Sequence, residues 1–352
     1  MGKTHCRIRH NYSVCGIVPP HILHELAKRG TEEQRMLALE TLAHSERLRG
    51  QREILSAFAI ATPAGQKRRT IYDAQHGTTL PGKLVRGETD PQNKEIDVNE
   101  AYDYSGVVYD FYKRVFSRNS VDDRGLRLDS TVHYSRRFDN AFWNGAQMVY
   151  GDGDGVIFQR FTKCLDVIGH ELTHGVTQYE AAFTYHDQPG ALNESMSDVF
   201  GVLVKQWELK QTVAQADWII GEGLFAPGVK GVGLRSMKAP GTAYDDPRLG
   251  EDPQPAHMKD YYKGADDNGG VHINSGIPNR AFYLAAMAIG GCAWEVAGKI
   301  WYTALCQNLR PSSKFIDAAN STVTVAANLY GDGSKQQKAV KDAWQTVGVL
   351  KC

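Results

Sequence analysis

The sequence predicts an α+β protein with two domains and a small helical module in front of them. Three observations support this prediction. Residues 66–165 contain short runs of aromatic and β-branched residues separated by Gly, Asp and Asn, which is typical of strands. Residues 166–352 place apolar residues at helical spacing over long segments. Residues 13–60 are charged and show two short helical patterns. We therefore expect three units, at residues 1–60, 61–165 and 166–352.

The charge balance and the N-terminal sequence limit the possible partners and locations. Lys and Arg number 40, as do Asp and Glu, so nothing argues for binding to nucleic acid or to an anionic membrane. No apolar run approaches the length of a membrane span. The first residues are basic, but no apolar region follows them. We expect a protein of the cytoplasm, or one exported without a recognisable signal peptide. The six scattered cysteines then read as free thiols.

The N-terminal module is expected to hold an extended segment followed by two helices. Pro19-Pro20 disfavours helix in the residues before it. A short helix over residues 23–28 ends at Gly30, and Thr31 with Gln34 forms a capping box for the next helix. The apolar residues of this second helix are Met36, Leu37, Leu39, Leu42, Ala43 and Leu48.

The middle unit is expected to be rich in short strands. A helix within residues 99–116 carries Tyr102, Tyr109 and Tyr112. The runs that read as strands cover residues 70–72, 106–109, 131–134, 147–150 and 156–158. The third unit contains the helical patterns at residues 281–289, 293–308, 314–329 and 335–347.

A His-Glu-x-x-His motif lies in the apolar stretch 167–176. On a helix, His170 and His174 lie four residues apart on one face and can bind the same metal ion. Glu171 is one step round the helix and can reach a water on that ion, the arrangement known from zinc proteases. The motif also arises by chance on amphipathic helices, so a third ligand is needed to distinguish a metal site from a chance match.

Glu194 is the candidate for that third ligand. Asp187-Gln188-Pro189-Gly190 reads as a turn, so Glu194 falls early in a second helix. Asp198 lies one turn further on the same face and can accept the second ring proton of His170. A solvated acidic helix face is the alternative. Apolar neighbours argue against it, since they bury the helix and buried carboxylates need partners; they are Ala191, Leu192, Met196, Val199 and Phe200.

His272 completes the candidate site. It follows Asp-Asn-Gly-Gly, a turn that presents the imidazole, and Asp267 is close enough in sequence to orient it. A lone histidine is more often structural. Beside a zinc site, however, an imidazolium would stabilise an oxyanion.

Taken together, these motifs resemble those of the thermolysin-like zinc metalloendopeptidases. The matching blocks run in the family's order from about residue 70 to the C-terminus. They cover residues 72–74, 78–82, 140–145, 148–155, 167–176, 190–198, 234–237 and 267–277. The N-terminal module resembles the short propeptide of the protealysin-like subset, because Pro19-Pro20-His21-Ile22-Leu23 fits its Pro-Pro-x-x-Leu-like motif.

The resemblance implies one catalytic Zn²⁺, held by His170, His174 and Glu194. It makes Glu171 the general base and later proton donor to the leaving amine, and it makes Tyr185 and His272 the oxyanion stabilisers. Asp267 is then the partner of His272.

The resemblance also implies a cleft for an extended peptide. Asn140 and Ala141 lie on an edge strand that binds the peptide backbone, and Arg235 holds a substrate carbonyl. The pocket on the leaving side of the bond is apolar, so we expect cleavage before bulky hydrophobic residues such as Leu, Ile or Phe; it is lined by Phe158, Phe161, Val167, Ile220 and Leu234.

The same resemblance assigns the N-terminal module the role of an inhibitor that blocks the cleft until it is removed. The alternative is a helical cap that stays attached. The change of composition places the cleavage between roughly residues 45 and 65. Cys15 is either a small core residue or a thiolate that fills the open zinc position.

The family's calcium sites are depleted in this chain. Asp166, Asp217 and Glu222 match the carboxylates of a double calcium site, but Lys205 stands where the family has an acid. Val232 stands where another site has an aspartate. We therefore expect at most one Ca²⁺, because the Lys205 ammonium can supply the counter-charge.

Two other functions remain open. A catalytically silent relative could bind peptides without cleaving them, but Glu171, Tyr185 and His272 are all present. An aminopeptidase needs an acidic anchor for a free amine, and none is evident. The expected partners are peptide or protein substrates and the chain's own propeptide, with the chain as a monomer.

Overall fold

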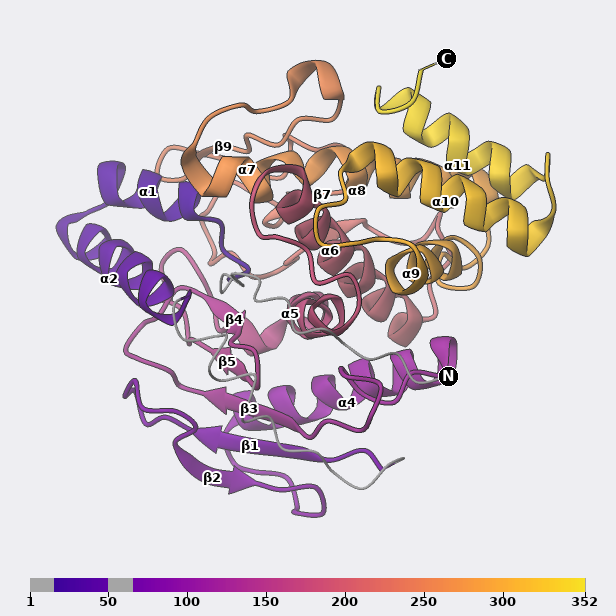
Figure 1. Cartoon of the computed structure of the whole chain (residues 1–352). Coiled ribbons are helices and arrows are strands. Elements are labelled where there is room, and N and C mark those ends of the chain that lie inside the picture. Colours follow the sequence, from indigo (N-terminus) through magenta and orange to yellow (C-terminus); the bar gives the residue numbers. More distant parts are fainter. Residues whose placement is uncertain (1–15, 50–65, 352) are drawn as a thin grey trace.

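The computed structural model describes residues 16–49 and 66–351 (Figure 1). A sheet with one long helix forms one end of the molecule, and a group of helices forms the other. The two halves meet at α5 (Leu165–Tyr179), which carries the His-Glu-x-x-His motif. The α+β prediction is therefore confirmed.

The N-terminal module consists of α1 (Pro20–Arg29) and α2 (Glu32–Arg49). The first helix begins at Pro20, earlier than the predicted residue 23, since proline fits the first turn of a helix. The capping box is confirmed: the Gln34 amide donates to Thr31 Oγ1 at 3.3 Å and the Thr31 amide to Gln34 Oε1 at 2.9 Å.

The two helices bury different amounts of apolar surface. In α1, Ile22, Leu23 and Leu26 are buried. In α2, by contrast, Met36 and Leu39 are 67% and 56% exposed while Leu42 packs against the core, so only part of its apolar spacing marks a core face. The His44 ring of α2 lies 6.1 Å from the rings of Tyr134 and Phe138, which places α2 beside the sheet domain.

The sheet of the first domain has five strands in the order β2-β1-β3-β5-β4. Strands β1, β3 and β5 are parallel, and β2 and β4 pair antiparallel at the two edges. The edge position predicted for Ala141 is therefore confirmed. The strand bounds are β1 (Arg69–Asp73), β2 (Lys83–Arg86), β3 (Leu128–Val132), β4 (Ala141–Trp143) and β5 (Met148–Tyr150).

Two predicted strands are wrong. Residues 106–109 lie inside α4 (Ile96–Phe116), because the spacing of buried Tyr102, Tyr109 and Tyr112 outweighs the local preference of two valines. Residues 156–158 form no strand, and Phe158 makes only an isolated bridge to Phe225. The long helix α4 packs on the sheet and reaches α5, where Tyr112 Oη lies 2.7 Å from Thr173 Oγ1.

The helix α6 (Asp187–Leu209) packs closely along α5. A β-carbon on Gly201 would lie 2.5 Å from the Asp166 carbonyl, and one on Gly169 would lie 3.0 Å from Gly201 Cα. Only glycine allows this approach. The predicted turn at 187–190 is wrong, since these residues form the first turn of α6, where Pro189 is tolerated.

The remaining elements build the helical domain and the loops at its edge. The peptide bends through left-handed backbone angles at Asp267, Asn268, Gly269 and Gly270 before presenting His272. The helices are α7 (Asp266–Asn274), α8 (Gly276–Ile289), α9 (Ala297–Gln307), α10 (Phe315–Tyr330) and α11 (Lys335–Thr346). Short elements are β6 (Ile219–Ile220), β7 (Arg235–Ser236), β8 (Asp245–Asp246), β9 (Gly250–Glu251), and the 3₁₀ turns η1 (Phe161–Lys163) and η2 (Met258–Asp260).

The described residues bear on two further predictions. None of their helices is long and apolar enough to cross a membrane. Cys164, Cys292 and Cys306 are free thiols, as predicted. Cys6, Cys15 and Cys352 lie outside the described residues, and so does most of the predicted cleavage window.

Candidate active site

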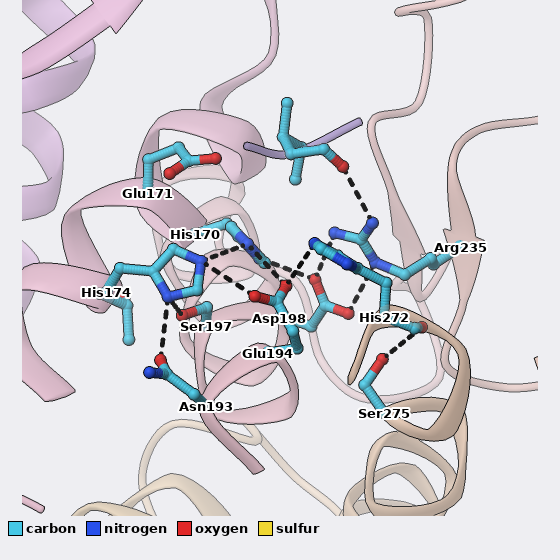
Figure 2. A network of polar contacts seen from close by, with 12 residues as sticks. His170, Glu171, His174, Asn193, Glu194, Ser197, Asp198, Arg235, His272 and Ser275 are labelled. Carbon is cyan, nitrogen blue, oxygen red and sulfur yellow. Dashed lines mark hydrogen bonds and ion pairs between the residues drawn. The ribbon is translucent and has the colours of Figure 1, made fainter. Parts of the chain in front are cut away.

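The side chains of His170, His174 and Glu194 converge between α5 and α6 (Figure 2). His170 Nε2 lies 3.0 Å from His174 Nε2, and each lies 3.5 Å from a carboxylate oxygen of Glu194. Ligands about 2.0–2.1 Å from a tetrahedral zinc ion are roughly 3.3 Å apart. Among residues 16–49 and 66–351, this is the one group with the spacing of a metal site.

The outer nitrogens of both rings are held by acceptors. His170 Nδ1 lies 2.8 Å from Asp198 Oδ1, and His174 Nδ1 lies 2.9 Å from Asn193 Oδ1 and 3.0 Å from Ser197 Oγ. If both Nδ1 atoms donate, both Nε2 lone pairs face the same point. Two such lone pairs repel each other unless a cation lies between them, so the residues fit Zn²⁺.

The charge around this point also favours a cation. Burial alone would lower the pKa of His170, but the carboxylates of Asp198 and Glu194 raise it to about 9. Burial would raise the pKa of Glu194, yet the imidazoles of His272, His174 and His170 hold it well below the usual value. Among the described residues, Glu194 Oε2 is buried and contacted only by imidazole nitrogens, at 3.4 Å (His272) and 3.5 Å (His170), which leaves it able to bind a metal.

Asp198 is the centre of a buried network behind His170 (Figure 2). Arg235 donates to both of its oxygens, from Nε at 2.8 Å and from Nη2 at 2.9 Å. Asn279 Nδ2 donates to Oδ2 at 2.8 Å. Burial raises the pKa of Asp198, but Arg235 and His170 outweigh it and lower the pKa to about 2. Asp198 is therefore a carboxylate that fixes both His170 and Arg235.

Sequence reasoning missed three members of these networks: Asn193, Ser197 and Asn279. The sequence carried a signal for the first two, because Asn193 adjoins Glu194 and Ser197 lies about one turn after Glu194 on α6. Asn279 comes from α8, so only the tertiary structure brings it to Asp198.

Glu171 lies beside the metal ligands and faces the edge strand β4. The backbone N–H of Trp143 donates to Glu171 Oε2 at 3.0 Å. The carboxylate is fully buried. Strand β4 thus fixes the direction of Glu171 relative to the two histidines.

Tyr185 and His272 lie beside the third metal ligand, Glu194. Tyr185 Oη donates to Glu194 Oε1 at 2.5 Å, and His272 Nε2 lies 3.4 Å from Tyr185 Oη and from Glu194 Oε2. Asp267 receives the His272 backbone N–H at 2.8 Å and its Nδ1 at 2.7 Å. Burial lowers the pKa of His272, but Asp267 and Glu194 outweigh it and raise the pKa.

The predicted cleft residues surround a segment of the N-terminal module. Ile17 N donates to the Ala141 carbonyl at 3.0 Å, and Val18 N donates to Asn140 Oδ1 at 3.0 Å. Arg235 Nη1 donates to the Ile17 carbonyl at 3.1 Å. Ile17 is fully buried in the main hydrophobic core, which also contains the predicted pocket residues Phe158, Phe161, Val167, Ile220 and Leu234.

A second charged cluster lies near the start of α5. Lys205 Nζ is 2.8 Å from Asp217, 3.3 Å from Glu222 and 3.5 Å from Asp166. Burial lowers the pKa of Lys205, but these carboxylates outweigh it and raise the pKa. An ammonium group therefore occupies the centre of this carboxylate set. Val232, at the other depleted calcium position, is 57% exposed.

Three family models match this chain. "Thermolysin metallopeptidase, catalytic domain" matches residues 55–178, and "Thermolysin metallopeptidase, alpha-helical domain" matches residues 181–349. Together they span most of the chain. The chain belongs to the thermolysin family of metallopeptidases. The third model, "Protealysin propeptide", matches residues 15–55. This thermolysin-family chain is thus a metalloprotease that carries a propeptide of the protealysin type.

Relatives with the same organisation are similar over nearly their whole length. An "Extracellular metalloprotease" of Pectobacterium carotovorum subsp. carotovorum is 54% identical over 96% of both chains. "Protease PrtS" of Photorhabdus sp. (strain Az29) is 49% identical over 96% of this chain and 93% of its own. The solved precursor of protealysin from Serratia proteamaculans is 54% identical, with a TM-score of 0.89 over 96% of this chain and 100% of that structure. The predicted resemblance is confirmed, and the zinc metalloendopeptidase prediction is supported.

Proposed function

We propose that this metalloprotease is an endopeptidase that cleaves before bulky hydrophobic residues. The observation that carries the proposal is the position of Ile17. Its N–H and carbonyl bind Ala141 and Arg235, the groups expected to hold a substrate backbone. Its side chain is apolar and fully buried in the main hydrophobic core, which also contains the predicted pocket residues. An acidic residue there would be buried without a partner, which is costly.

Each residue of the site has a role in this reaction. His170, His174 and Glu194 would hold Zn²⁺, which supplies a Lewis acid for the scissile carbonyl and lowers the pKa of a water molecule toward neutrality. Glu171 takes a proton from the attacking water and delivers it to the leaving nitrogen. Tyr185 and His272 donate to the oxyanion, and Asp267 keeps His272 protonated and oriented. Asp198 positions His170 and Arg235.

The propeptide acts as an intramolecular inhibitor in this proposal. Residues 16–18 run antiparallel to β4 and use the backbone groups that a substrate needs, which is recognition by strand addition. A substrate therefore cannot bind until this segment leaves. We propose that residues 1–60 form the propeptide and that the two catalytic domains meet at residue 165. The possible contact of Cys15 with zinc concerns a residue outside the described part.

The metal content follows from the two charged clusters. One Zn²⁺ fits the His-His-Glu group, whereas the Lys205 ammonium supplies the positive charge within the Asp166, Asp217 and Glu222 carboxylates. We therefore propose that the Lys205 cluster binds no Ca²⁺. The chain as a whole is expected to bind at most one Ca²⁺ ion. Peptides or proteins are the proposed substrates, and the chain is proposed to act as a monomer. The name of one relative, "Extracellular metalloprotease", supports the proposal that this chain is exported.

The decisive test follows intact mass and peptide cleavage together. Purified wild-type protein is compared with Glu171→Ala and with the matched control Glu208→Ala, an exposed carboxylate on α6. Wild type and Glu208→Ala are expected to shed the propeptide and to cut a peptide before Leu, whereas Glu171→Ala stays whole and inactive. Cleavage before Glu in preference to Leu would refute the specificity proposal. An inactive wild type without its propeptide would favour the silent binding module.

A further inference from the structure

The edge strand β4 places one particular peptide bond of the propeptide at the catalytic groups. Gly16 pairs antiparallel with Phe142, and Ile17 N donates to the Ala141 carbonyl. The next residue of the strand, Trp143, donates its backbone N–H to Glu171. Gly16 therefore lies one register step from the residue that fixes the general base.

The groups on the other side of this bond fix Ile17. Its carbonyl accepts from Arg235 Nη1 at 3.1 Å, and the same guanidinium binds Asp198, which in turn holds His170. The bond between Gly16 and Ile17 thus lies between the Glu171 side and the Arg235 side of the cleft.

Residues 16–18 run through the cleft in the direction that hydrolysis of a bound peptide requires. Ile17 is apolar and fully buried, as the proposed function requires of the residue after a cleaved bond, and its N–H and carbonyl bind Ala141 and Arg235. The bond before Ile17 is therefore the one presented for hydrolysis. The rest of the propeptide supports this register, because Val18 N donates to Asn140 Oδ1 and α1 begins two residues later. Gly16 suits the position, since a β-carbon there would lie 2.5 Å from the Asn140 amide.

We propose that the Gly16–Ile17 peptide bond is a substrate of the precursor's own active site and is cut within the same molecule. This inference rests on the proposed function. Water adds its oxygen to the Gly16 carbonyl carbon, and Glu171 carries both protons of that water, one after the other, to the Ile17 nitrogen. The C–N bond breaks to give a Gly16 carboxylate and an Ile17 α-ammonium group. No further reactant is needed.

An intramolecular reaction has a large advantage here. The bond is held beside the general base at an effective concentration that no free peptide reaches, so its cleavage does not depend on enzyme concentration. The cut does not release the propeptide, because α1 and its buried residues Ile22, Leu23 and Leu26 remain docked. The shortened propeptide then starts at Ile17 and still occupies the leaving side of the cleft.

The test is top-down mass spectrometry of freshly purified full-length precursor over time, at concentrations that differ 100-fold. Loss of residues 1–16 with the same first-order rate at every concentration is expected. Ile17→Asp should slow this cut by more than about 100-fold, because a carboxylate would enter the apolar pocket, whereas Ile17→Leu should keep it. Glu171→Ala should show no cut at all.

A second arm separates cleavage within one molecule from cleavage by another. Glu171→Ala precursor is mixed with active mature enzyme, which can reach exposed sites but not a bond buried in another molecule's cleft. The Gly16–Ile17 bond is expected to stay intact there until the propeptide is shed. Cleavage at this bond as fast as in wild type would overturn the proposal.

A free peptide that contains an internal Leu, and so a bond before Leu, is assayed in parallel. If mature enzyme cuts it while wild-type precursor never shows a species starting at Ile17, this inference fails and the proposed function stands. If the free peptide also stays intact, the proposed function fails with it.

Discussion

The ammonium group of Lys205 lies 2.8 Å from Asp217 Oδ2. The lysine comes from the end of α6, and the carboxylate comes from the loop before β6. Asp166, in the first turn of the zinc-motif helix α5, lies 3.5 Å from the same nitrogen. One side chain therefore ties the metal-binding helix to its neighbour and to a surface loop, which is a task that a bound cation could also perform.

Lys205→Ala is expected to destabilise the protein strongly. It leaves Asp166, which is 2% exposed, without its counter-charge, and loss of one partner of a buried pair costs about 3–5 kcal/mol. Thermal unfolding of the Glu171→Ala precursor background, with and without Lys205→Ala, measures the effect without autolysis. Calcium should not change the unfolding temperature of the parent; a clear rise on adding calcium would contradict this account.

Lys205→Glu tests the same site from the other direction. A fourth carboxylate makes the cluster repulsive without metal but suitable for Ca²⁺, which binds carboxylate oxygens. This variant should be less stable than the parent in chelator and should regain stability in calcium. Lys205→Ala is the matched control, and an equal response of both variants to calcium would rule out a rebuilt site.

Asp198→Asn should weaken zinc binding and catalysis together. The change removes the anion that holds His170 Nδ1 and leaves the buried Arg235 without its charge partner. Loss of such an orienting carboxylate typically costs 10–100-fold in metal affinity or activity. Zinc affinity is measured by competition with a chromogenic chelator, and activity is measured on a peptide at saturating zinc. Glu208→Ala serves as the control. Unchanged zinc affinity would show that Asp198 does not support His170.

His21 should make propeptide docking sensitive to pH. Its Nε2 lies 2.9 Å from Tyr244 Oη, and its buried Nδ1 has no hydrogen-bond partner among the residues that the structure describes. Burial lowers its pKa from 6.5 to about 4, helped by the nearby charges of His272 and Arg235 and opposed by Asp267.

The docked and released forms of the propeptide bind a proton at His21 over different pH ranges. Released His21 binds a proton below about pH 6.5, whereas docked His21 does so only below about 4. Docking is therefore at full strength above pH 6.5 and weakens as the pH falls toward 4, by at most about 1.4 kcal/mol per pH unit. Binding of a fluorescent peptide to the Glu171→Ala precursor should increase from pH 7 to pH 5. His21→Gln should remove most of this change, while the neighbouring exposed His24→Gln should keep it. An unchanged pH profile in His21→Gln would exclude this role.

The sequence predicted the elements whose signals are local. The spacing of His170 and His174, the capping box at Thr31 and the tyrosine pattern of α4 all depend on neighbours within a few residues. The strands expected at 106–109 and 156–158 were wrong, because tertiary packing overrides the preferences of short apolar runs.

The candidate site shows the same division between local and distant contacts. Asp198 could be assigned from its place one turn after Glu194, whereas Asn279 reaches it from α8 across 81 positions of the chain. The contact of Ile17 with Arg235 spans 218 positions. No pattern in one sequence predicts such a pair without the resemblance, since nothing local marks either partner.

Gly201 should tolerate no side chain, because the zinc-motif helix lies against it. An added β-carbon would lie 2.5 Å from the Asp166 carbonyl and 3.1 Å from the His170 amide, and neither backbone group can move without moving His170. Overpacking of this kind costs about 1–3 kcal/mol, more than the small gain from replacing glycine in a helix. Gly201→Ala should therefore lower both the free energy of unfolding, by about 2 kcal/mol, and zinc affinity. The control is Gly228→Ala, where the left-handed backbone (φ +93°) adds strain but an added β-carbon meets no described atom beyond its chain neighbours within 4 Å. Denaturant unfolding with chelator titration compares the two, and the packing argument fails if only Gly228→Ala alters stability or if zinc binding is equal in both.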